Sequence, residues 1–321
     1  MKRVRVHEFG GPEVLQLEEF EGFQPQAGQV VVRVKAAGVN PYDTYMRLGA
    51  YGARNPPLPY TPGSDAAGTV EAIGSGVTDL KSGDRVYTTG TVSGAYAEVA
   101  LCEAHQVHRL PDRISFAQGA GLYVPYATAY RSLFQLAKAQ PGETVLIHGA
   151  SGGVGTAAIQ LGRAAGVKLF GTAGSEEGLK LISAEGVDKV FNHRAADYQK
   201  EILDATGGKG VDVILEMLAN KNLGVDLTLL AQRSRVAVIG SRGTVEINPR
   251  DAMSRQASII GVYLWGVGES EAKEIFSALD AGMESGAIRP IVGLELPLAS
   301  AAEAHRRILE PGALGKIVLI P

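Results

Sequence analysis

A glycine-rich segment at 149–155 has the residue types and spacing to hold the phosphates of a dinucleotide. It reads Gly-Ala-Ser-Gly-Gly-Val-Gly, follows an apolar run at 144–147 and precedes an alanine-rich run at 157–165. The apolar run predicts a strand and the alanine-rich run predicts a helix. The glycines allow a sharp turn and a close approach to phosphates, and the helix N-terminus offers free N–H groups. The segment therefore predicts a dinucleotide-binding turn.

Strands and helices alternate around this turn, which predicts the domain that must position it. Strand patterns fall at 144–148, 168–172, 189–192, 211–217, 235–239 and 258–264, and helical patterns at 176–184, 197–205 and 223–231. Such alternation predicts an α/β fold with a parallel, doubly wound sheet, and six strands make a full Rossmann set. We assign residues 123–264 to this domain.

The segments on either side predict a second, β-rich domain. Strand patterns at 30–35, 68–73, 83–87 and 95–100 are separated by glycine and proline turns, which favours an antiparallel barrel and leaves a sandwich open. The tail has helical patterns at 271–282 and 300–309 and an apolar strand pattern at 315–320. Because that strand needs a sheet to join, we expect residues 265–321 to complete the domain formed by residues 1–122.

Composition limits the classes of function. The 321 residues are 20% charged and 45% hydrophobic, with a net charge of -3 and no lysine- or arginine-rich block, which argues against a nucleic-acid-binding protein. One cysteine, Cys102, excludes an intramolecular disulfide and suits a reducing compartment. No apolar run approaches 18 residues and the N-terminus lacks a signal-peptide pattern, so we expect a cytoplasmic protein without a membrane partner.

The end of the second strand of the α/β domain indicates which coenzyme binds. Enzymes that use NAD usually place a carboxylate there for the ribose 2′-hydroxyl, but residues 170–175 read Phe-Gly-Thr-Ala-Gly-Ser. Lys180 and Arg194 could neutralise a 2′-phosphate, which favours NADPH over NADH. The alternative for Lys180 is an ordinary solvated lysine on a helix.

The same glycine segment also fits the G-x-S-x-G turn of a serine hydrolase. Ser151 would be the nucleophile, and His193 and His305 follow it in the chain order of such enzymes. The additional Gly155 and the regular alternation that follows favour dinucleotide binding instead.

A short cluster near the single cysteine has metal-ligating residue types. Cys102, Glu103, His105 and His108 lie close together, but the flanking residues predict a strand and a loop, and the sequence has no second ligand cluster. A structural or surface role is the favoured interpretation.

Spaced motifs run along nearly the whole chain, at 9–15, 38–41, 59–65, 142–143, Leu146, 150–153, Gly155, Gln160, Arg163, 171–174, 191–194, 216–220, 240–243 and 246–251. Together they resemble the quinone oxidoreductases of the zeta-crystallin type, in the medium-chain dehydrogenase/reductase superfamily. The resemblance implies a GroES-like β-barrel catalytic domain, a Rossmann domain, bound NADPH and reduction of a small-molecule quinone.

The resemblance also implies roles for single residues. Asn40 and Tyr45 match positions near the nicotinamide, Tyr51 lies just beyond them, and Thr128 matches another position there or packs in the turn that enters the Rossmann domain. The remaining cofactor contacts that it implies are Ser151, Gly152, Gly153 and Val154 at the pyrophosphate, Gly174, Lys180 and His193 at the adenosine end, Asn222, Ile239, Gly240, Ser241 and Arg242 along the cleft, and Val262, Tyr263 and Leu264 beside the nicotinamide.

Comparison with the zinc alcohol dehydrogenases of the same superfamily implies a site without metal. Their zinc cysteine would fall at Asn40, and the histidine and glutamate of their Gly-His-Glu motif fall at Ser64 and Asp65. Without soft ligands a tetrahedral zinc site cannot form. Our hypothesis is hydride or electron transfer from NADPH to a quinone, with Tyr45 or Tyr51 hydrogen-bonding the developing oxyanion and Asn40 fixing the site.

Two alternatives for the function stay open, and the oligomeric state is a separate question. The same scaffold could reduce the carbon–carbon double bond of an enone or alkenal, or the chain could be a non-catalytic NADPH-binding protein of the crystallin or RNA-binding kind. The apolar strand at 258–264 would be an exposed sheet edge, which predicts a homodimer formed by pairing of the edges. A tetramer is also compatible with this pattern.

Overall fold

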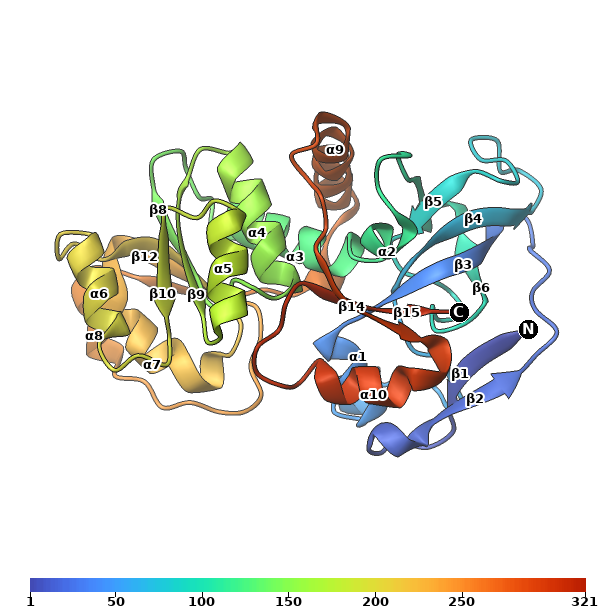
Figure 1. Ribbon diagram of the computed structural model, residues 1–321, viewed down its shortest axis with the longest axis horizontal. Helices are drawn as coiled ribbons and strands as arrows, with labels where there is room; N and C mark the ends of the chain where they lie inside the picture. Colours follow the sequence, from blue (N-terminus) through green and yellow to red (C-terminus); the bar gives the residue numbers. More distant parts are fainter. The chain divides into compact units, whose positions relative to one another are not determined.

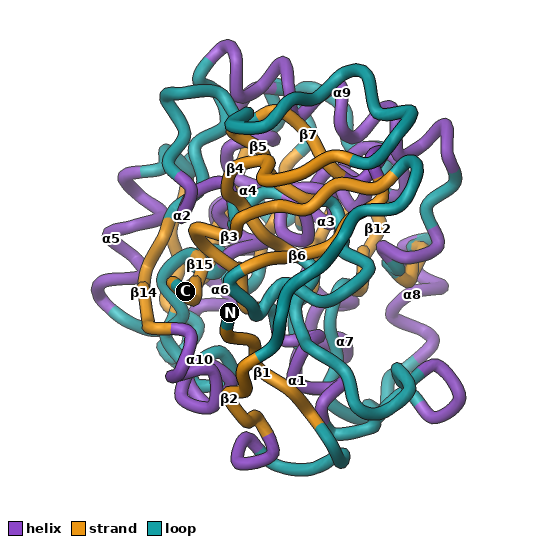
Figure 2. The backbone as a smooth tube through the Cα atoms, turned by 90° about the vertical axis from the view of Figure 1, so that its right-hand side faces the viewer, coloured by secondary structure: helices purple, strands orange, loops and turns teal.

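The computed structural model describes all residues from 1 to 321, and they form two compact units. Unit 1 consists of Met1–Val124, Pro290–Pro311 and Lys316–Pro321, and unit 2 of Pro125–Arg289 and Gly312–Gly315. Each unit contains its own large sheet (Figure 1), and Figure 2 shows strands of the unit 1 sheet side by side. No helix in either unit combines the length and the apolar character needed to cross a bilayer.

Unit 2 is built on a six-stranded sheet in which every strand pairing is parallel. Its order is β10-β9-β8-β11-β12-β13, which is the 3-2-1-4-5-6 order of the Rossmann fold and confirms the predicted sheet. Its strands are β8 (Thr144–Ile147), β9 (Lys168–Ala173), β10 (Lys189–Asn192), β11 (Val211–Glu216), β12 (Leu230–Val238) and β13 (Ser258–Gly261).

Helices follow the strands of this sheet and cover its apolar core. Leu146, Phe170, Ile214 and Val236 come from four neighbouring strands and pack in one buried cluster. The helices are α3 (Thr128–Tyr130), α4 (Gly153–Ala164), α5 (Glu176–Ala184), α6 (Tyr198–Ala205), α7 (Ala219–Leu229), α8 (Pro249–Arg255) and α9 (Glu269–Ser285). The predicted strand at 258–264 is shorter than expected, because the chain leaves the sheet after Gly261.

Unit 1 is built on a mostly antiparallel sheet that is centred on one long strand. β3 pairs antiparallel with β4, β6 and β15, and its residues Val30, Val32 and Val34 lie in the buried core. The strands of this sheet are β3 (Gln29–Val39), β4 (Asp65–Ile73), β5 (Arg85–Thr88), β6 (Val99–Glu103), β7 (Val107–Arg109), β14 (Val292–Pro297) and β15 (Lys316–Ile320), and a separate hairpin pairs β1 (Lys2–Val6) with β2 (Leu15–Glu19).

The helices of unit 1 are short: α1 (Pro41–Arg47), α2 (Phe116–Gly119) and α10 (Ala301–Arg307). The last apolar strand of the sequence lies in this sheet, since β15 pairs with both β3 and β14. The helix α9 belongs to the compact unit of the Rossmann sheet, whereas the predicted domain of residues 1–122 and 265–321 includes it. The functional boundaries of the two domains stay a prediction.

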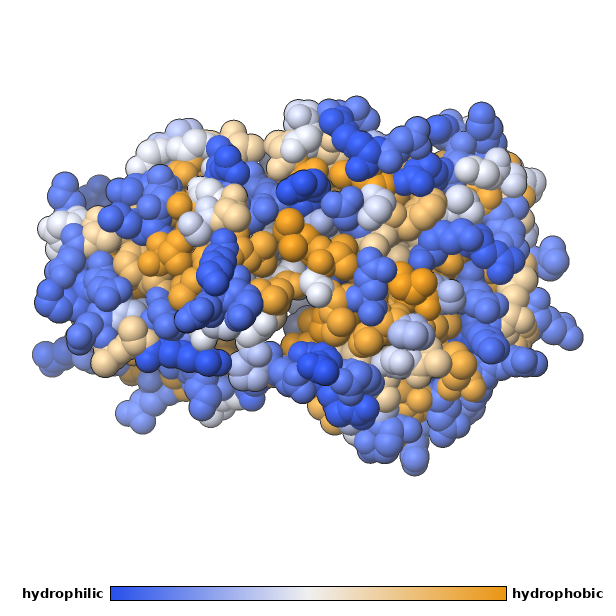
Figure 3. Space-filling model, in the orientation of Figure 1, coloured by the Kyte–Doolittle hydropathy of each residue, from blue (hydrophilic) through white to orange (hydrophobic).

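Hydrophilic side chains cover much of the face seen in Figure 3, with smaller hydrophobic patches between them.

The cysteine and histidines near Cys102 that the sequence offers as metal ligands have structural surroundings instead. Cys102 is fully buried on β6, and His108 stacks on Tyr87 with ring centroids 5.2 Å apart. Burial raises the pKa of Cys102 to about 12 and lowers that of His108 to about 4, as expected for structural side chains.

Candidate active site

The glycine segment forms the turn between β8 and α4, as its spacing predicts. Gly149 has a φ of 56°, which suits glycine, and α4 begins at Gly153 with Gly152 as its N-cap. A Cβ atom at Gly155 would lie 2.5 Å from the carbonyl oxygen of Ala150, so only glycine lets the helix start this close to the strand. The N–H groups of the first turn of α4 have no partners within the helix and are available to an anion.

Ser151 is held by two hydrogen bonds with a later part of the chain. Its hydroxyl donates to the carbonyl oxygen of Ala313 at 2.7 Å, and the N–H of Gly315 donates to its carbonyl oxygen at 2.6 Å. A hydrolase would need this hydroxyl to donate to a histidine. The interpretation of Ser151 as a nucleophile is therefore not supported by the geometry.

The end of β9 has the neutral character expected of an NADPH site. Ser175 caps α5 by accepting a hydrogen bond from the N–H of Gly178, so the two glutamates that follow belong to the helix start. Gly174 lies against the next strand, because a Cβ atom there would be 2.4 Å from His193 and 3.1 Å from Arg194. These three residues thus lie together, and Lys180 is on the exposed side of α5.

The other predicted cofactor residues follow the carboxyl ends of β11, β12 and β13. The N–H groups of Ile239 and Gly240 both donate to the carbonyl oxygen of Glu216, and the N–H of Arg242 donates to Asn220 at 2.9 Å. The N–H of Val262 donates to Val238 at 2.9 Å. Since the strands are parallel, this is the edge that also carries the glycine turn, where open α/β sheets bind their ligands.

A buried cluster that the sequence analysis missed lies at the same edge. It consists of His148, which follows β8, Glu216, which ends β11, and Asp226 of α7. His148 Nε2 is 2.9 Å from Asp226 Oδ1 and 3.7 Å from Glu216 Oε2, while Glu216 Oε1 accepts hydrogen bonds from Leu218 and Asn222. The cluster thereby links His148, the residue before the glycine turn, to helix α7, which carries both Asp226 and Asn222.

Burial dominates the electrostatics of this cluster. It raises the pKa of Glu216 and of Asp226 to about 7 and lowers the pKa of His148. Glu216 Oε2 and Asp226 Oδ2 have no N–H or O–H partner. A proton on one of the two carboxyl groups removes most of the cost of burying both of them as anions.

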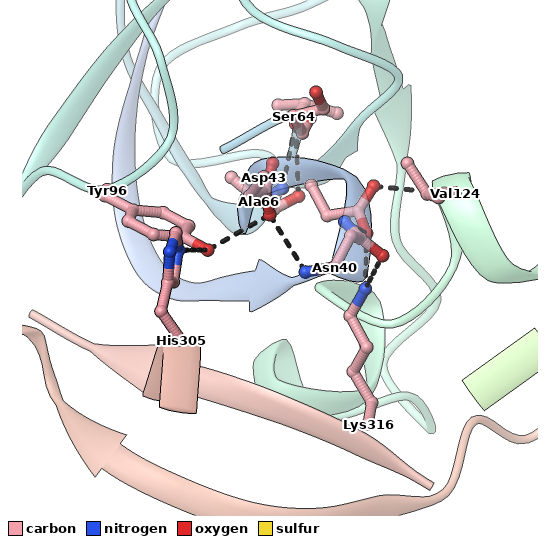
Figure 4. A network of polar contacts seen from close by, with 10 residues as sticks. Asn40, Asp43, Ser64, Ala66, Tyr96, Val124, His305 and Lys316 are labelled. Carbon is pink, nitrogen blue, oxygen red and sulfur yellow. Dashed lines mark hydrogen bonds and ion pairs between the residues drawn. The ribbon is translucent and has the colours of Figure 1, made fainter. Parts of the chain in front are cut away.

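In unit 1, Asn40 lies at the start of α1 within a buried polar network (Figure 4). Its side-chain Nδ2 donates to Asp65 Oδ2 at 2.9 Å, and Lys316 Nζ donates to Asn40 Oδ1 at 2.6 Å and to Asp65 Oδ2 at 2.7 Å. The other oxygen of Asp65 accepts the N–H of Val124 at 3.0 Å. Asn40, Asp65 and Lys316 are exposed by only 4%, 1% and 3%, so water does not screen these bonds.

Asp43 extends the network towards the C-terminal helix of the unit. Asp43 Oδ2 accepts the N–H of Asn40 at 2.8 Å and the hydroxyl of Tyr96 at 3.0 Å. Because that hydroxyl has given up its only hydrogen, His305 Nε2 donates to it across 3.2 Å. Burial raises the pKa of Asp43 to about 7 and lowers that of His305 to about 3.

The tyrosines predicted for catalysis are on or just after the same short helix. Tyr45 is half-buried on α1, and the ring of Tyr51 lies 5.4 Å from that of Tyr42, which is also on α1. The structure thus brings Asn40, Tyr45 and Tyr51 into one segment of unit 1. Thr128 belongs to α3 of unit 2, where its carbonyl oxygen accepts the hydroxyl of Ser132 at 2.6 Å.

The residues at the position of a catalytic zinc do not suit that metal. Asn40 offers an amide and Asp65 a carboxylate, both already bound to an ammonium group at 2.6 and 2.7 Å, and Ser64 stands where a histidine would be needed. Zinc sites need thiolate, imidazole or free carboxylate ligands, and a lysine ammonium repels a cation. The site therefore does not fit zinc.

The residues of unit 2 do fit a dinucleotide. Glycine is required at Gly155 and Gly240, where a Cβ atom would lie 2.5 Å from Ala150 and 2.4 Å from Met217. At both positions two backbone segments pass close to each other at the carboxyl edge of the sheet. The missing side chains leave room there for a pyrophosphate. This cradle is what the dinucleotide-binding turn requires.

Comparisons with known proteins agree with both units. Residues 26–112 match the family described as alcohol dehydrogenase GroES-like domain, and residues 153–281 match the family described as zinc-binding dehydrogenase. The GroES-like match confirms the predicted class of the first domain. The second family is named for zinc, although the residues described above do not suit that metal.

Relatives match along the whole chain. Human quinone oxidoreductase is 52% identical over all of this chain and 98% of its own length. The structure of Escherichia coli quinone oxidoreductase complexed with NADPH is 33% identical, with a TM-score of 0.88 and full coverage of both chains. CurK enoyl reductase is 28% identical, with a TM-score of 0.90 and coverage of 99% and 98%. The chain belongs to the quinone oxidoreductase family of the medium-chain dehydrogenase/reductase superfamily.

Proposed function

We propose that this protein is an NADPH-dependent quinone reductase that works without a metal. The observation that carries the proposal is the cofactor edge of the unit 2 sheet, whose glycine turn follows β8 and whose β9 ends without a carboxylate. Relatives named quinone oxidoreductase match this chain over its full length. The substrate is a small molecule, and NADPH is the coenzyme.

Each predicted cofactor residue has a role in this proposal. Ser151, Gly152, Gly153 and Val154 hold the pyrophosphate. Since the Ser151 hydroxyl already donates to Ala313, backbone N–H groups are the main donors there. Gly174, Lys180 and His193 bind the adenosine end, and the contacts along the remainder of the coenzyme come from Asn222, Ile239, Gly240, Ser241, Arg242, Val262, Tyr263, Leu264 and Thr128.

In this reaction the protein mainly binds the coenzyme and the quinone and orients them. Bound NADPH would supply a hydride, which is one proton with two electrons, and a quinone that takes up this hydride and one further proton becomes a hydroquinone. A quinone accepts hydride readily, so hydrogen-bond donors can replace a Lewis acid. Tyr45 or Tyr51 would stabilise the negative charge that develops on the quinone oxygen, and Asn40 would orient the reacting groups.

The test is NADPH oxidation by purified, chelator-treated protein with 1,4-benzoquinone and 9,10-phenanthrenequinone, and with NADH in a parallel series. We expect turnover with NADPH that chelation does not change. Activity that is lost on chelation and restored by zinc would overturn the metal-free proposal. NADPH binding without turnover of any quinone would overturn the catalytic one and favour a crystallin-like role.

A second activity has a specific observation in its favour. The structural likeness to CurK enoyl reductase, at a TM-score of 0.90, shows that this fold also occurs in a double-bond reductase. Reduction of an enone or alkenal is therefore the alternative reaction for the same site. A simple enone in the same assay distinguishes them, because a higher kcat/KM for the enone than for every quinone would reverse the assignment.

We also propose that two copies of the chain associate through β13. This strand pairs only with β12, and Ile259, which is on the strand, is 43% exposed. An unpaired apolar edge is a template for another strand. Light scattering should give a dimer for the wild type, or a tetramer built from such dimers, and a monomer for Ile259→Lys.

Two broader expectations belong to the same proposal. We assign the substrate-binding groups to a domain of residues 1–122 and 265–321, and the coenzyme to residues 123–264. A cytoplasmic location is supported by the single, buried Cys102, because extracellular proteins usually pair their cysteines. RNA binding is the least supported alternative, given the net charge of -3.

A further inference from the structure

Lys316 is the first residue of β15 and its side chain is almost completely buried. It is 3% exposed, although lysine is rarely buried without a partner. Its ammonium group is bound to one carboxylate, Asp65, and to one uncharged amide, that of Asn40. Figure 4 shows the lysine reaching up to Asn40 from the C-terminal strand.

These contacts determine which way the Asn40 amide points. An ammonium group can only donate, so the atom at 2.6 Å from Lys316 Nζ must be the amide oxygen. The amide nitrogen then donates one hydrogen to Asp65 at 2.9 Å. The second amide hydrogen of Asn40 is not used in these two contacts and its oxygen is bound to a cation, so Asn40 can act on a ligand only as a donor.

The backbone around Lys316 is arranged to admit its side chain. β15 runs antiparallel to β3 with Val318 opposite Gly38. A Cβ atom at Gly38 would lie 2.6 Å from Lys316 Cε, 2.9 Å from Asp65 Cβ and 2.0 Å from the carbonyl oxygen of Ala120. Glycine at this position therefore leaves room for the end of the lysine side chain, which a Cβ atom here would crowd.

The positive charge of Lys316 compensates the negative charge of a buried carboxylate in this part of unit 1. Asp65 and Asp43 are both buried, and the charge of Asp65 is one of the causes that raise the pKa of Asp43. The same carboxylate would be one of the ligands if a metal bound here. An ammonium group at 2.7 Å supplies the positive charge that a metal would otherwise supply.

We propose that Lys316 is a positioning residue for the quinone reductase reaction: its ammonium group replaces the missing metal as the cation of the site and holds Asn40 as a hydrogen-bond donor. This inference rests on the proposed function. Lys316 itself does not touch the substrate or the coenzyme in this proposal, and it acts only through Asn40. The ligand atom that Asn40 recognises is consequently an acceptor, such as a carbonyl oxygen of the quinone or of the nicotinamide carboxamide.

A double-mutant cycle tests this directly, with kcat, KM and the Kd for NADPH measured for Lys316→Met, Asn40→Ala and the double variant. We expect Lys316→Met to lower kcat/KM about 30-fold to 100-fold, the scale of a small loss of alignment. In the Asn40→Ala background the same change should lower it less than about twofold. Two losses that multiply would overturn the proposal, because they would show that Lys316 acts independently of Asn40.

Lys316→Met leaves Asp65 without its cation and can fail to fold, so a second variant keeps the test decisive. Asp65→Asn/Lys316→Met removes both charges and should fold, and it should keep most of the loss in kcat/KM. Wild-type kcat/KM in this variant would overturn the proposal. Lys35→Met is the matched control, since Lys35 is an exposed lysine of the same sheet and should leave kcat/KM within about twofold.

The binding measurement separates this proposal from the proposed activity. If the wild type reduces no quinone, the proposed function fails, but the Kd for NADPH can still be measured through the same cycle. Coupling between Lys316 and Asn40 in that Kd would then still support the positioning role. Equal Kd values and equal kcat/KM for the wild type and Lys316→Met would overturn it.

Discussion

His148 Nε2 and Asp226 Oδ1 are 2.9 Å apart, and both side chains are buried beneath the glycine turn of unit 2. A neutral imidazole can donate to the carboxylate there while Glu216, 3.7 Å from the same nitrogen, carries a proton. The arrangement uses no lysine or arginine. It therefore links the end of β8 to α7, while the folded protein keeps a carboxyl proton that the unfolded chain would release.

Stability should depend on pH through these protons. The pKa of Glu216 and of Asp226 is raised to about 7 in the folded protein. The contribution of these two carboxyl groups to the unfolding free energy is therefore fully present below their pKa in the unfolded chain, near 4, and is lost as pH rises to about 7. The raised pKa of Asp43 also makes its contribution to stability fall as pH rises. The lowered pKa of His148 makes the contribution of that residue increase as pH rises. Glu216→Gln keeps the neutral form at all pH values and should remove a fall of about 3 kcal/mol in unfolding free energy between pH 4 and 7.

Urea unfolding of the wild type and Glu216→Gln at a series of pH values is the measurement. The groups that face Glu216 include His148, Asp226 and Asn222, and His148 in turn is close enough to His193 to help lower the pKa of His193. Glu201→Gln, on the exposed side of α6, is the control and should keep the wild-type profile. An unchanged slope in Glu216→Gln would show that Glu216 does not hold the proton.

Gly155→Ala should weaken both the fold of unit 2 and its coenzyme binding. The added Cβ atom would lie 2.5 Å from the Ala150 carbonyl oxygen, so α4 must move away from the turn. We expect a loss of about 2–3 kcal/mol in stability and at least a tenfold rise in the Kd for NADPH. Gly153→Ala is the comparison for stability, because its Cβ atom would be 3.6 Å from the nearest neighbour and should cost little. Equal melting temperatures for the two variants would contradict this account.

The choice of NADPH over NADH should depend on cations near the end of β9. Lys180→Ala and Arg194→Ala each remove a positive charge that could pair with the 2′-phosphate, and a charged hydrogen bond contributes about 1.5–3 kcal/mol. The KM for NADPH should rise about tenfold or more in at least one of them, while the KM for NADH stays the same. Lys189 lies at the opposite end of β10, so Lys189→Ala should leave both constants unchanged. Parallel changes for the two coenzymes would exclude both residues as 2′-phosphate ligands.

Tyr45→Phe and Tyr51→Phe separate the two candidates for oxyanion stabilisation. Each variant removes one hydroxyl and leaves the ring, so packing on α1 and beside Tyr42 should be kept. The residue that donates to the developing oxyanion should lose at least about tenfold in kcat with little change in KM. Unchanged turnover in both variants would remove the tyrosines from the mechanism and leave water as the donor.

Tyr96→Phe should disturb Asp43 without changing the chemistry directly. The Tyr96 hydroxyl donates to Asp43 Oδ2 at 3.0 Å, and both groups are fully buried or nearly so. Loss of this donor should cost about 1–3 kcal/mol of stability and raise the pKa of Asp43 further. Thermal unfolding of Tyr96→Phe beside Tyr198→Phe, a half-buried tyrosine of α6, measures the effect. Equal stabilities would mean that Asp43 does not depend on this hydrogen bond.

The sequence predicts the strand, turn and helix at the carboxyl edge of the unit 2 sheet well because their signals are local. The glycine turn, the apolar strands and the neutral end of β9 each lie within about ten residues, where period and spacing are informative. The start of α1 also had a local signal that we did not use. Asn40, Pro41 and Asp43 are the N-cap, first and third residues of a capped helix, and Asn40 donates its N–H to Asp43.

The buried networks could not be predicted, because they depend on contacts between distant parts of the chain. Lys316 and Asn40 are 276 residues apart, and their contact requires the register that places Val318 opposite Gly38. His148 follows β8 and Asp226 is on α7, so they meet only when the sheet and its helix pack together. In the sequence, Lys316 is one charged residue at the start of an apolar strand, which is more often a solvated edge residue.

The position of β15 in the sheet has a consequence for biosynthesis. β3 is made early, but its neighbour β15 emerges from the ribosome only after all six strands of unit 2. Until then Asp65 lacks the ammonium partner that it has in the folded protein. Unit 1 should consequently acquire its compact state after unit 2, so a translation arrest before residue 316 should leave the N-terminal segment sensitive to protease while the Rossmann sheet resists it.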